Sequence, residues 1–491
     1  MKYFITILFT VFGFSIFAQR GGHEIKFTIS DLPNGKIVVA HHYAGKHYIT
    51  DTVRTNAKGI GYLKGDEPIT NGVYLAVFPA IDNKHFEFII GSQKFEVETK
   101  VAHLQKNLSF KNSIDNDLFY KDIESMTATR NQIEELKKQL ETAEDSNKKK
   151  LETQIELVNK KFLNSRNRIM DEYPDLFYSK LLMLMKEVKI PESPKDEDGN
   201  VIDPAFAFNY FRANYWNYTD FSEEGILRTP VFHNKLMDYF EKYTSPEPDS
   251  LIKSCDIVLS LAEQNDEVFK YVLVNLLNKY ANSKIMGHDG VYVHLVLEYY
   301  AKGKAPWTEE EQLKKILERA NALKPLLLGN ISPDLILRDT SLNVKFKLHD
   351  LPFDFTIVYV WDPECGHCKK SAPIINDFLN KYRDESIMVY GISTVNTEKL
   401  NVWKKFINEK NLNWVNVADP YYETNFRKIY DIASTPQIFV LDKNKKIIAK
   451  RIGANQLEDF FHNYLKAKED DRYKKFKPRS TSDDPLDDEI H

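Results

Sequence analysis

The chain has 491 residues, of which 42% are hydrophobic, and its formal net charge at neutral pH is −4. This length predicts two to four domains, each with an ordinary apolar core. A charge so close to balance argues against nucleic acid as a partner, because phosphate recognition needs clustered positive charge. The 3 cysteines are too few for a disulfide framework in a chain of this size.

The first eighteen residues have the pattern of an export signal. Lys2 precedes an apolar run that continues to Phe17 and ends at the small residue Ala18. A secretory signal peptide at 1–18 explains this pattern. A membrane span or a core strand is the alternative, and the apolar run is shorter than the roughly 20 residues that a membrane span needs. No later stretch is apolar for long enough to span a membrane. We therefore expect an exported, soluble mature chain, periplasmic or extracellular, without a transmembrane segment.

Residues 22–110 alternate between apolar and polar side chains and are interrupted by turn residues. Alternation with a period of two predicts strands, and Asn34-Gly35 between two such segments predicts a hairpin. We expect a small all-β domain, either a sandwich or barrel-like. The clearest segments are 24–29, 36–41, 72–78 and 86–90.

Three histidines of this region, His41, His42 and His47, raise the question of a metal site. Alternation places His41 and His42 on opposite faces of a strand, and no cysteine or second histidine pair completes a ligand set. We therefore expect no metal here. The sequence predicts no cofactor elsewhere in the chain.

Residues 115–328 are expected to form a central all-α domain. Between Asp115 and Tyr173 the apolar residues keep a helical spacing with a slip at 145–147, which predicts either one long helix or a helical hairpin. A helix packed on its neighbours is preferred over a coiled-coil surface for a partner. Further helices are expected at 251–262, 267–280 and 308–323, the last with a capping box formed by Thr308 and Glu311.

A run of aromatic residues follows a charged loop at 191–200. Bulky side chains at helical spacing usually belong to a core, and this is the preferred interpretation. A groove for a peptide or a sugar is the alternative. The run comprises Phe206, Phe208, Tyr210, Phe211, Tyr215, Trp216, Tyr218 and Phe221.

The strongest catalytic signal is Cys365-Gly366-His367-Cys368, which follows the apolar run 356–360. Two cysteines with this spacing, at the junction of a strand and a helix, can close a disulfide and reopen it. Gly366 is expected to allow the tight turn. A helix that begins at or near Cys365 favours a thiolate there through its positive end. We predict that Cys365 is the nucleophile and Cys368 the resolving thiol.

The helix terminus alone is not expected to activate Cys365 fully. Lowering a thiol pKa by about two units takes roughly 2.7 kcal/mol, whereas a helix terminus supplies about 0.3–2 kcal/mol. His367 and a hydrogen bond from the Cys368 thiol are the expected supplements. The third cysteine, Cys255, is interpreted as a buried helical thiol, with a role as intermolecular partner of Cys365 as the alternative.

These residues resemble the active-site strand and helix of the thioredoxin superfamily. The downstream Ser434-Thr435-Pro436, before the apolar run 437–441, resembles the second signature of that family. The resemblance implies an α/β thioredoxin-like domain at about 330–466 and a cis Pro436 that faces the disulfide. It also implies that the backbone of Thr435 offers an edge where an extended protein substrate pairs.

Further segments resemble the TlpA-like and AhpC/TSA-like branch of exported thiol–disulfide oxidoreductases, in which a small β domain and a helical domain of unknown function precede the redox domain. These segments are a leading hairpin from Ser332 to Leu348 and an additional helix at 398–408 with a strand at 414–418. In that family an acid occupies the places of Tyr359 or Ser371, and this chain has neither. His367 or water is the expected proton acceptor instead.

The predicted function is that of an exported thiol–disulfide oxidoreductase that acts on protein disulfides and depends on an unidentified redox partner. Whether it reduces, oxidises or isomerises its substrates stays open. A binding or scaffold protein with a redox-weak module is one alternative. A thiol peroxidase is another, weakened because Val358 and Asp362 stand where peroxidases of this superfamily have Pro and Thr. Residues 467–491 form a charged tail that is expected to be disordered.

Overall fold

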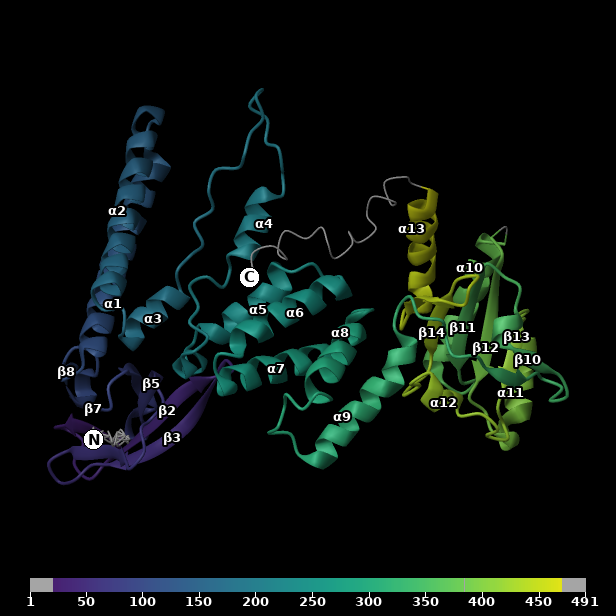
Figure 1. Cartoon of the computed structure of the whole chain (residues 1–491), viewed down its shortest axis with the longest axis horizontal. Coiled ribbons are helices and arrows are strands. Elements are labelled where there is room, and N and C mark those ends of the chain that lie inside the picture. The colour runs from purple at the N-terminus through teal and green to yellow at the C-terminus, as the bar shows by residue number, and fades with distance from the viewer. Residues whose placement is uncertain (1–20, 384, 470–491) are drawn as a thin grey trace, which may run out of the picture. The chain divides into compact units, whose positions relative to one another are not determined.

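The computed structural model describes residues 21–383 and 385–469, which form two compact units (Figure 1). The first unit comprises the residues up to Tyr243 together with Ala262–Val268, and the second comprises Thr244–Leu261 and the residues from Phe269 onward. The expected signal peptide at 1–18 and the tail from residue 470 lie outside the described residues. The last helix, α13 (Leu457–Glu469), continues beyond residue 466, where the sequence predicted the C-terminal domain to end.

The N-terminal strands form a sandwich of two four-stranded sheets, which confirms the expected all-β class. Alternate apolar side chains of both sheets, such as Phe27 and Phe88, share one core. One sheet has the order β4-β1-β7-β8, with β4 (Ile60–Gly65), β1 (His23–Ile29), β7 (Lys94–Thr99) and β8 (Ser109–Lys111). The other has the order β3-β2-β5-β6, with β3 (Lys46–Arg54), β2 (Lys36–Tyr43), β5 (Gly72–Phe78) and β6 (Lys84–Ile90).

The hairpin predicted at Asn34-Gly35 is wrong, because β1 and β2 belong to different sheets. Asn34 does adopt the left-handed conformation, with φ of 53°. Its backbone N–H donates to the Asn56 carbonyl at 3.0 Å, and the N–H of Gly35 donates to the Thr55 hydroxyl at 2.8 Å. The turn is therefore held by a distant segment and carries the chain from one sheet to the other.

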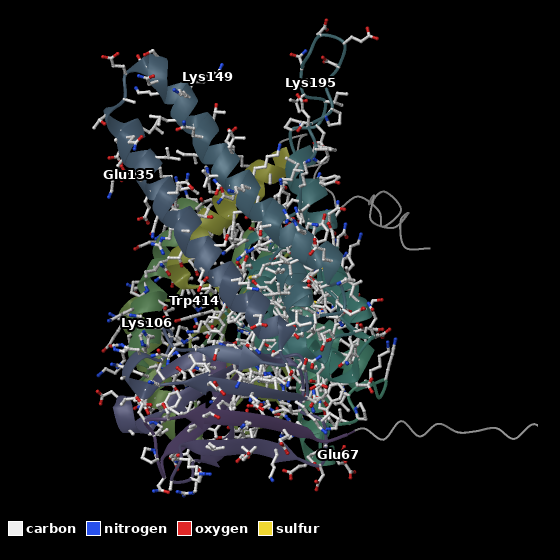
Figure 2. The ribbon with its side chains drawn as sticks, turned by 90° about the vertical axis from the view of Figure 1, so that its left-hand side faces the viewer. Glu67, Lys106, Glu135, Lys149, Lys195 and Trp414 are labelled. Carbon is white, nitrogen blue, oxygen red and sulfur yellow. The ribbon has the colours of Figure 1, made fainter. Side chains whose placement is uncertain are left out.

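Two long helices, α1 (Ile114–Thr142) and α2 (Asp145–Glu172), form a helical hairpin, which decides between the two predicted alternatives. The Ser113 hydroxyl caps α1 by accepting the N–H of Asn116. Arg166 of α2 donates three hydrogen bonds to the buried carboxylate of Asp122 of α1, which ties the two helices together. Figure 2 shows the two helices side by side, labelled at Glu135 and Lys149.

Shorter helices complete the helical region. The first unit contains α3 (Phe177–Leu184), α4 (Phe206–Ala213) and α5 (Phe232–Lys242). The second contains α8 (His288–Leu295) and α9 (Glu310–Leu323), and α6 (Pro248–Ala262) and α7 (Asp266–Ala281) contribute residues to both units. In the part of the chain that the structure describes, no helix combines the length and the hydropathy that crossing a membrane requires.

The predicted capping box at the start of α9 is wrong. The N-cap is Glu309, one residue later than predicted, and no side chain caps it. Thr308 instead takes part in the preceding turn, where its N–H donates to the Ala305 carbonyl. Cys255 is fully buried in α6, and burial raises the pKa of its thiol well above the usual value.

The C-terminal region is an α/β domain built on a seven-stranded mixed sheet, as expected. Its order is β10-β9-β13-β12-β11-β14-β15, and β11 is parallel to β12 and antiparallel to β14. The strands are β9 (Ile336–Arg338), β10 (Lys345–Lys347), β11 (Phe355–Trp361), β12 (Ile387–Ser393), β13 (Val415–Ala418), β14 (Gln437–Leu441) and β15 (Ile447–Lys450).

The two faces of this sheet are covered by different helices. The odd-numbered residues of β11 pack with α10 (Gly366–Lys381), α11 (Leu400–Lys410) and α13. Val358 and Val360 point to the other face, where α12 (Phe426–Ile429) contributes to the core. The hairpin of β9 and β10 and the additional α11 and β13 lie close to their predicted positions. The chain therefore passes from the buried strand β11 to α10 through the short loop 362–365.

Candidate active site

The candidate site forms where β11 ends and α10 begins, at the loop from Asp362 to Cys365. Asp362 closes this loop, because its carbonyl accepts the N–H of Cys365 at 3.2 Å and one carboxylate oxygen accepts the N–H of Glu364 at 2.8 Å. The other carboxylate oxygen accepts a hydrogen bond of 2.9 Å from the Thr394 hydroxyl at the end of β12. Cys365 is the N-cap residue of α10, as the sequence predicted.

Gly366 does not play the steric part expected of it. Its φ lies outside the left-handed region, and an added Cβ would meet no atom within 4 Å. The turn is instead held by the hydrogen bonds of Asp362. A side chain at position 366 would therefore fit the observed backbone.

The two sulfurs of the motif have opposite environments. Cys365 is half-buried, and hydrogen bonding, chiefly from the backbone N–H of Cys368, lowers the pKa of its thiol despite the opposing effect of burial. Cys368 is fully buried, and burial raises the pKa of its thiol to about 11. Neither cysteine is in a disulfide in this structure. The arrangement provides one accessible thiol that ionises readily and a second that stays protonated behind it.

The supplements predicted for Cys365 are present in a modified form. The Cys368 side chain contributes a hydrogen bond to Cys365, as expected. His367 contributes through its backbone N–H, while its residue is exposed at the surface. The peptide groups of the first helical turn therefore supply the largest stabilisation of the thiolate, in agreement with the orphan N–H groups of a helix N-terminus.

The Thr435–Pro436 peptide bond is cis and lies directly before β14, which pairs with β11. The register of that pair sets Gln437 opposite Val360, so the two signature segments meet at the same end of the sheet. The Cys365 thiol donates to the Thr435 carbonyl at 3.5 Å. The structure thus brings Cys365, Cys368, Thr435 and Pro436 together, as the sequence predicted.

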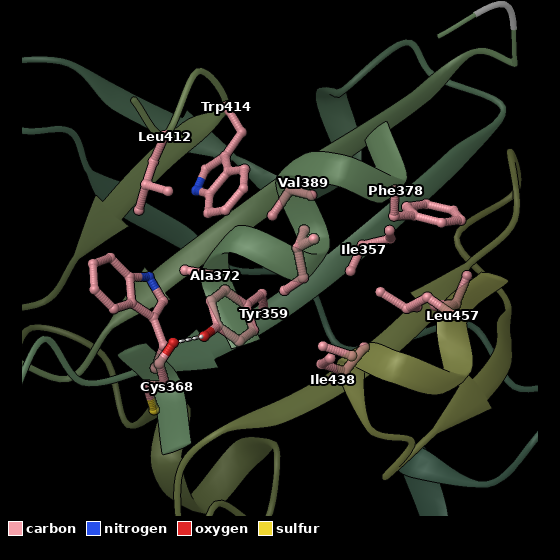
Figure 3. Close-up of a cluster of buried hydrophobic side chains, with 14 of the residues drawn as sticks. Ile357, Tyr359, Cys368, Ala372, Phe378, Val389, Leu412, Trp414, Ile438 and Leu457 are labelled. Atoms are coloured by element: carbon pink, nitrogen blue, oxygen red, sulfur yellow. Dashed lines mark hydrogen bonds between the residues drawn. The ribbon is translucent and has the colours of Figure 1, made fainter. Parts of the chain in front are cut away.

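Behind Cys368 the site is aromatic and neutral. Tyr359 is fully buried, and its hydroxyl donates to the Cys368 carbonyl at 3.2 Å (Figure 3). Burial raises the pKa of the Tyr359 phenol, with a smaller opposing effect from the nearby Ser371, whose hydroxyl donates to the His367 carbonyl at 3.0 Å. The two positions where the resembling family carries an acid therefore lie next to each other here and hold a phenol and an alcohol.

Sequence reasoning missed the role of Asp362 at this site. Its backbone N–H donates to the Cys368 sulfur at 3.4 Å, while its side chain closes the loop. Its place directly after the predicted strand was the available signal. Among the residues that the structure describes, no group of three or more His, Cys, Asp and Glu side chains has the arrangement of a metal site.

Two family models match the chain. Residues 328–450 match the AhpC/TSA family, and residues 184–324 match a domain of unknown function, DUF5106. The thiol–disulfide oxidoreductase ResA of Bacillus cereus is 25% identical over 138 residues, which are 28% of this chain and 76% of that protein.

Similar solved structures cover different shares of the chain. The crystal structure of a domain of a possible thiol-disulfide isomerase from Cytophaga hutchinsonii is 41% identical, with a TM-score of 0.28, and the match covers 30% of this chain and 97% of that domain. A thioredoxin-like protein from Bacteroides caccae is 17% identical, with a TM-score of 0.45, over 57% of this chain and 99% of that one.

Proposed function

Since the chain belongs to the thioredoxin superfamily, through a C-terminal domain of the AhpC/TSA family that is joined to a domain of unknown function, we propose that it is an exported thiol–disulfide oxidoreductase acting on protein disulfides. The observation that carries this proposal is the contrast between the two sulfurs. Hydrogen bonds lower the pKa of Cys365, and burial raises that of Cys368 to about 11.

In the reducing direction, which is one of the three that the sequence leaves open, the Cys365 thiolate first attacks one sulfur of a substrate disulfide. A mixed disulfide forms between Cys365 and that sulfur, and the other substrate sulfur leaves as a thiolate that takes a proton from water. The Cys368 thiol loses its proton in the second step and attacks the Cys365 sulfur. The second substrate thiolate is released, the substrate has gained two electrons, and the enzyme holds a Cys365–Cys368 disulfide. A dithiol partner then reduces this disulfide and completes the cycle.

The neutral surroundings of Cys368 make its deprotonation the slow part of this scheme. A thiol with a pKa of about 11 is almost wholly protonated at neutral pH, so it does not compete with Cys365 for the substrate. Tyr359 and Ser371 offer no carboxylate to accept the proton. The proton therefore leaves to water or to the exposed imidazole of His367.

The substrate-binding element of this proposal is the segment before β14. The Thr435 carbonyl accepts a hydrogen bond from the Cys365 thiol and lies on a partly exposed stretch. An extended polypeptide that paired with this backbone would bring its disulfide to the sulfur of Cys365. A protein disulfide fits this arrangement better than a small thiol, because pairing needs a peptide backbone.

The same neutral surroundings favour a second candidate function, a binding or scaffold protein whose redox domain works slowly. The peroxidase alternative is disfavoured, because Val358 is buried on the opposite face of the sheet and the carboxylate of Asp362 is engaged by Thr394. Neither residue offers a free donor to a peroxide. Hydrogen peroxide consumption with a thiol donor should therefore stay at background.

The proposal is tested by insulin reduction with dithiothreitol as the electron donor. We expect the intact protein to accelerate precipitation of the insulin B chain, and the Cys368→Ser variant to accumulate mixed disulfides through Cys365. Rates at background, with residue 365 alkylated no faster than an ordinary exposed thiol, would replace this proposal by the scaffold function. Export is tested separately, by N-terminal sequencing of protein recovered outside the cytoplasm, which should begin at Gln19.

A further inference from the structure

A cavity of about 670 Å³ lies within the first unit, between the segment that follows α3, the end of α4 and the helix α5. This volume is within the range of small-molecule sites, which is about 300–1,000 Å³. Its apolar lining includes Leu184, Val188, Ile190, Phe211, Tyr215 and Tyr243. It belongs to a different unit from the two cysteines of the candidate active site.

The aromatic wall of this cavity is a compact cluster. The ring centroids of Phe211 and Tyr243 are 4.7 Å apart, and the ring of Tyr215 lies 5.5 Å from the first and 5.3 Å from the second. The residues of the aromatic run therefore do not all line the cavity. Tyr215, Trp216 and Phe221 are all buried, and of the run only Phe211 and Tyr215 also line the cavity.

One cation, Lys235 of α5, reaches into this aromatic and apolar lining. Its ammonium donates to the Leu184 carbonyl at 2.9 Å and lies 5.3 Å from the centroid of the Tyr215 ring. The Tyr215 hydroxyl donates to the Lys235 carbonyl at 2.9 Å, which fixes the ring beside the lysine. Burial lowers the pKa of Lys235 to about 8.

No carboxylate pairs with Lys235 in the described part of the chain. Asp238, on the same helix and also on the lining, accepts a salt bridge of 2.9 Å from Lys242. An ammonium has three N–H donors, and one carbonyl and one ring face leave part of this capacity unused. Lys235 is half-buried, so its ammonium has lost part of its hydration without gaining a counter-ion. An anion that entered the cavity would recover part of that cost.

We propose that this cavity binds a small organic anion in which an apolar or aromatic group carries one carboxylate. The carboxylate accepts hydrogen bonds from the ammonium of Lys235, and the apolar body packs against Phe211, Val188 and Tyr243. An uncharged apolar ligand leaves the ammonium unpaired, and an inorganic anion leaves the aromatic wall unused. The remaining charges on the lining are Lys186, Glu187 and Asp238, of which the first two are exposed.

The test uses the full chain and 3-phenylpropionate as the probe, with calorimetric titration at neutral pH. We expect saturable binding to one site. The uncharged 3-phenylpropionamide should bind about tenfold to a hundredfold more weakly, because hydrogen bonds to charged groups contribute about 1.5–3 kcal/mol. Equal affinity for the acid and the amide, or no saturable binding of the acid, would overturn the proposal.

Two variants locate the binding to Lys235. Lys235→Met keeps the apolar stem of the side chain but removes the ammonium. Its affinity for 3-phenylpropionate should fall by the same factor that separates the acid from the amide on the unaltered protein. Lys161→Met, at an exposed position of α2, should bind like the unaltered protein. Unchanged affinity in Lys235→Met contradicts the proposal. The comparison of acid and amide on the unaltered protein decides the question independently, should Lys235→Met fail to fold.

Discussion

The Cys365 site and the cavity at Lys235 each contain a side chain whose pKa is lowered, and the causes are opposite. At Cys365, backbone N–H groups stabilise the charged thiolate, so the charged form gains. At Lys235, burial removes water from the ammonium, so the charged form loses. In the proposed functions, the first arrangement activates a nucleophile and the second leaves a cation available to an anion.

The difference also explains what a sequence can reveal. The N–H groups that act on Cys365 belong to residues two and three positions along the chain, and the C-x-x-C motif therefore encodes them locally. The burial of Lys235 depends on Leu184 and Tyr215, which lie 51 and 20 positions away. The residues next to Lys235 in the sequence therefore do not predict its burial.

The largest expected effect separates the two sites by function. Cys365→Ser should reduce the rate of insulin reduction to background, a loss of about a thousandfold or more, because it removes the attacking sulfur. Lys235→Met should leave that rate within about twofold, because the cavity lies in the other unit and takes no part in disulfide exchange. An equal loss of rate in both variants would show that the two sites do not act independently, and would contradict the contrast between them.

A buried lysine of the second unit, which does have a carboxylate partner, can be compared with the unpaired Lys235. Lys450 is 2% exposed, forms a salt bridge with Asp289 and donates to the Leu326 carbonyl at 2.6 Å. Asp289→Asn leaves this ammonium without its counter-ion and should lower the free energy of unfolding by about 3–5 kcal/mol in chemical denaturation.

Two further variants serve as controls for that experiment. Lys235→Met removes a cation that has no carboxylate partner, together with the cost of burying its charge. It should therefore not lower the free energy of unfolding by more than about 1 kcal/mol. Lys399→Gln breaks the exposed pair with Glu364 and should leave the free energy of unfolding nearly unchanged, because water and salt screen such a pair. A cost for Asp289→Asn as small as that of Lys399→Gln contradicts the structural role assigned to Lys450.

The pH dependence of alkylation compares the two sulfurs directly. The thiolate is the reactive form, so the alkylation rate rises as pH rises through the pKa of each thiol. For Cys365 the midpoint should lie below that of an ordinary thiol, and for Cys368 near 11. At neutral pH the rates should differ by at least about a hundredfold.

Mass spectrometry of the reduced protein after brief iodoacetamide treatment resolves the alkylated peptides. In the Cys365→Ser variant the alkylation rate of Cys368 is measured without competition from Cys365. The alkylation rate of the buried Cys255 serves as a reference. A common midpoint for both sulfurs would show that backbone hydrogen bonding does not distinguish them.

The smallest expected effect concerns His41, where burial acts as it does at Lys235. Burial, with smaller contributions from Arg228 and His42, lowers the pKa of His41 to about 4. The unfolded chain binds a proton near pH 6.5 and the folded chain resists it, so stability is lost as pH falls from about 6.5 to 4. With allowance for partial exposure, the loss between pH 7 and pH 5 should be about 1 kcal/mol. Denaturation of His41→Gln should lack this part of the acid sensitivity, whereas an unchanged pH profile would assign it to other groups.

The order of strands and helices could be predicted because alternation and helical spacing are local patterns. The strand at 72–78 coincides with β5, and the two sequence signatures of the candidate site do meet in space. The error at Asn34-Gly35 arose because a distant segment decides the path of the turn. Asn34-Gly35 bonds to residues 55 and 56, so its turn connects two sheets.

Asp362 was missed as part of the site because its backbone N–H contacts the Cys368 sulfur and its carboxylate bonds to the distant Thr394. Its place directly after the strand was a signal of position and not of these contacts. The cavity at Lys235 was missed for a related reason. The sequence favoured a core for the aromatic run, and Tyr215, Trp216 and Phe221 are indeed buried. Which rings also line a cavity depends on the packing of α4 and α5, which the run itself does not encode.

The salt bridge of Lys450 has a practical consequence for dissecting the chain. Asp289 belongs to the stretch that matches the domain of unknown function, while Lys450 is the last residue of the stretch that matches the AhpC/TSA family. A fragment that begins at residue 328 would lose both Asp289 and the Leu326 carbonyl. It would retain Lys450 without these two partners. A fragment that begins at Thr244 keeps both partners, and is the safer choice for isolating the redox module in working order.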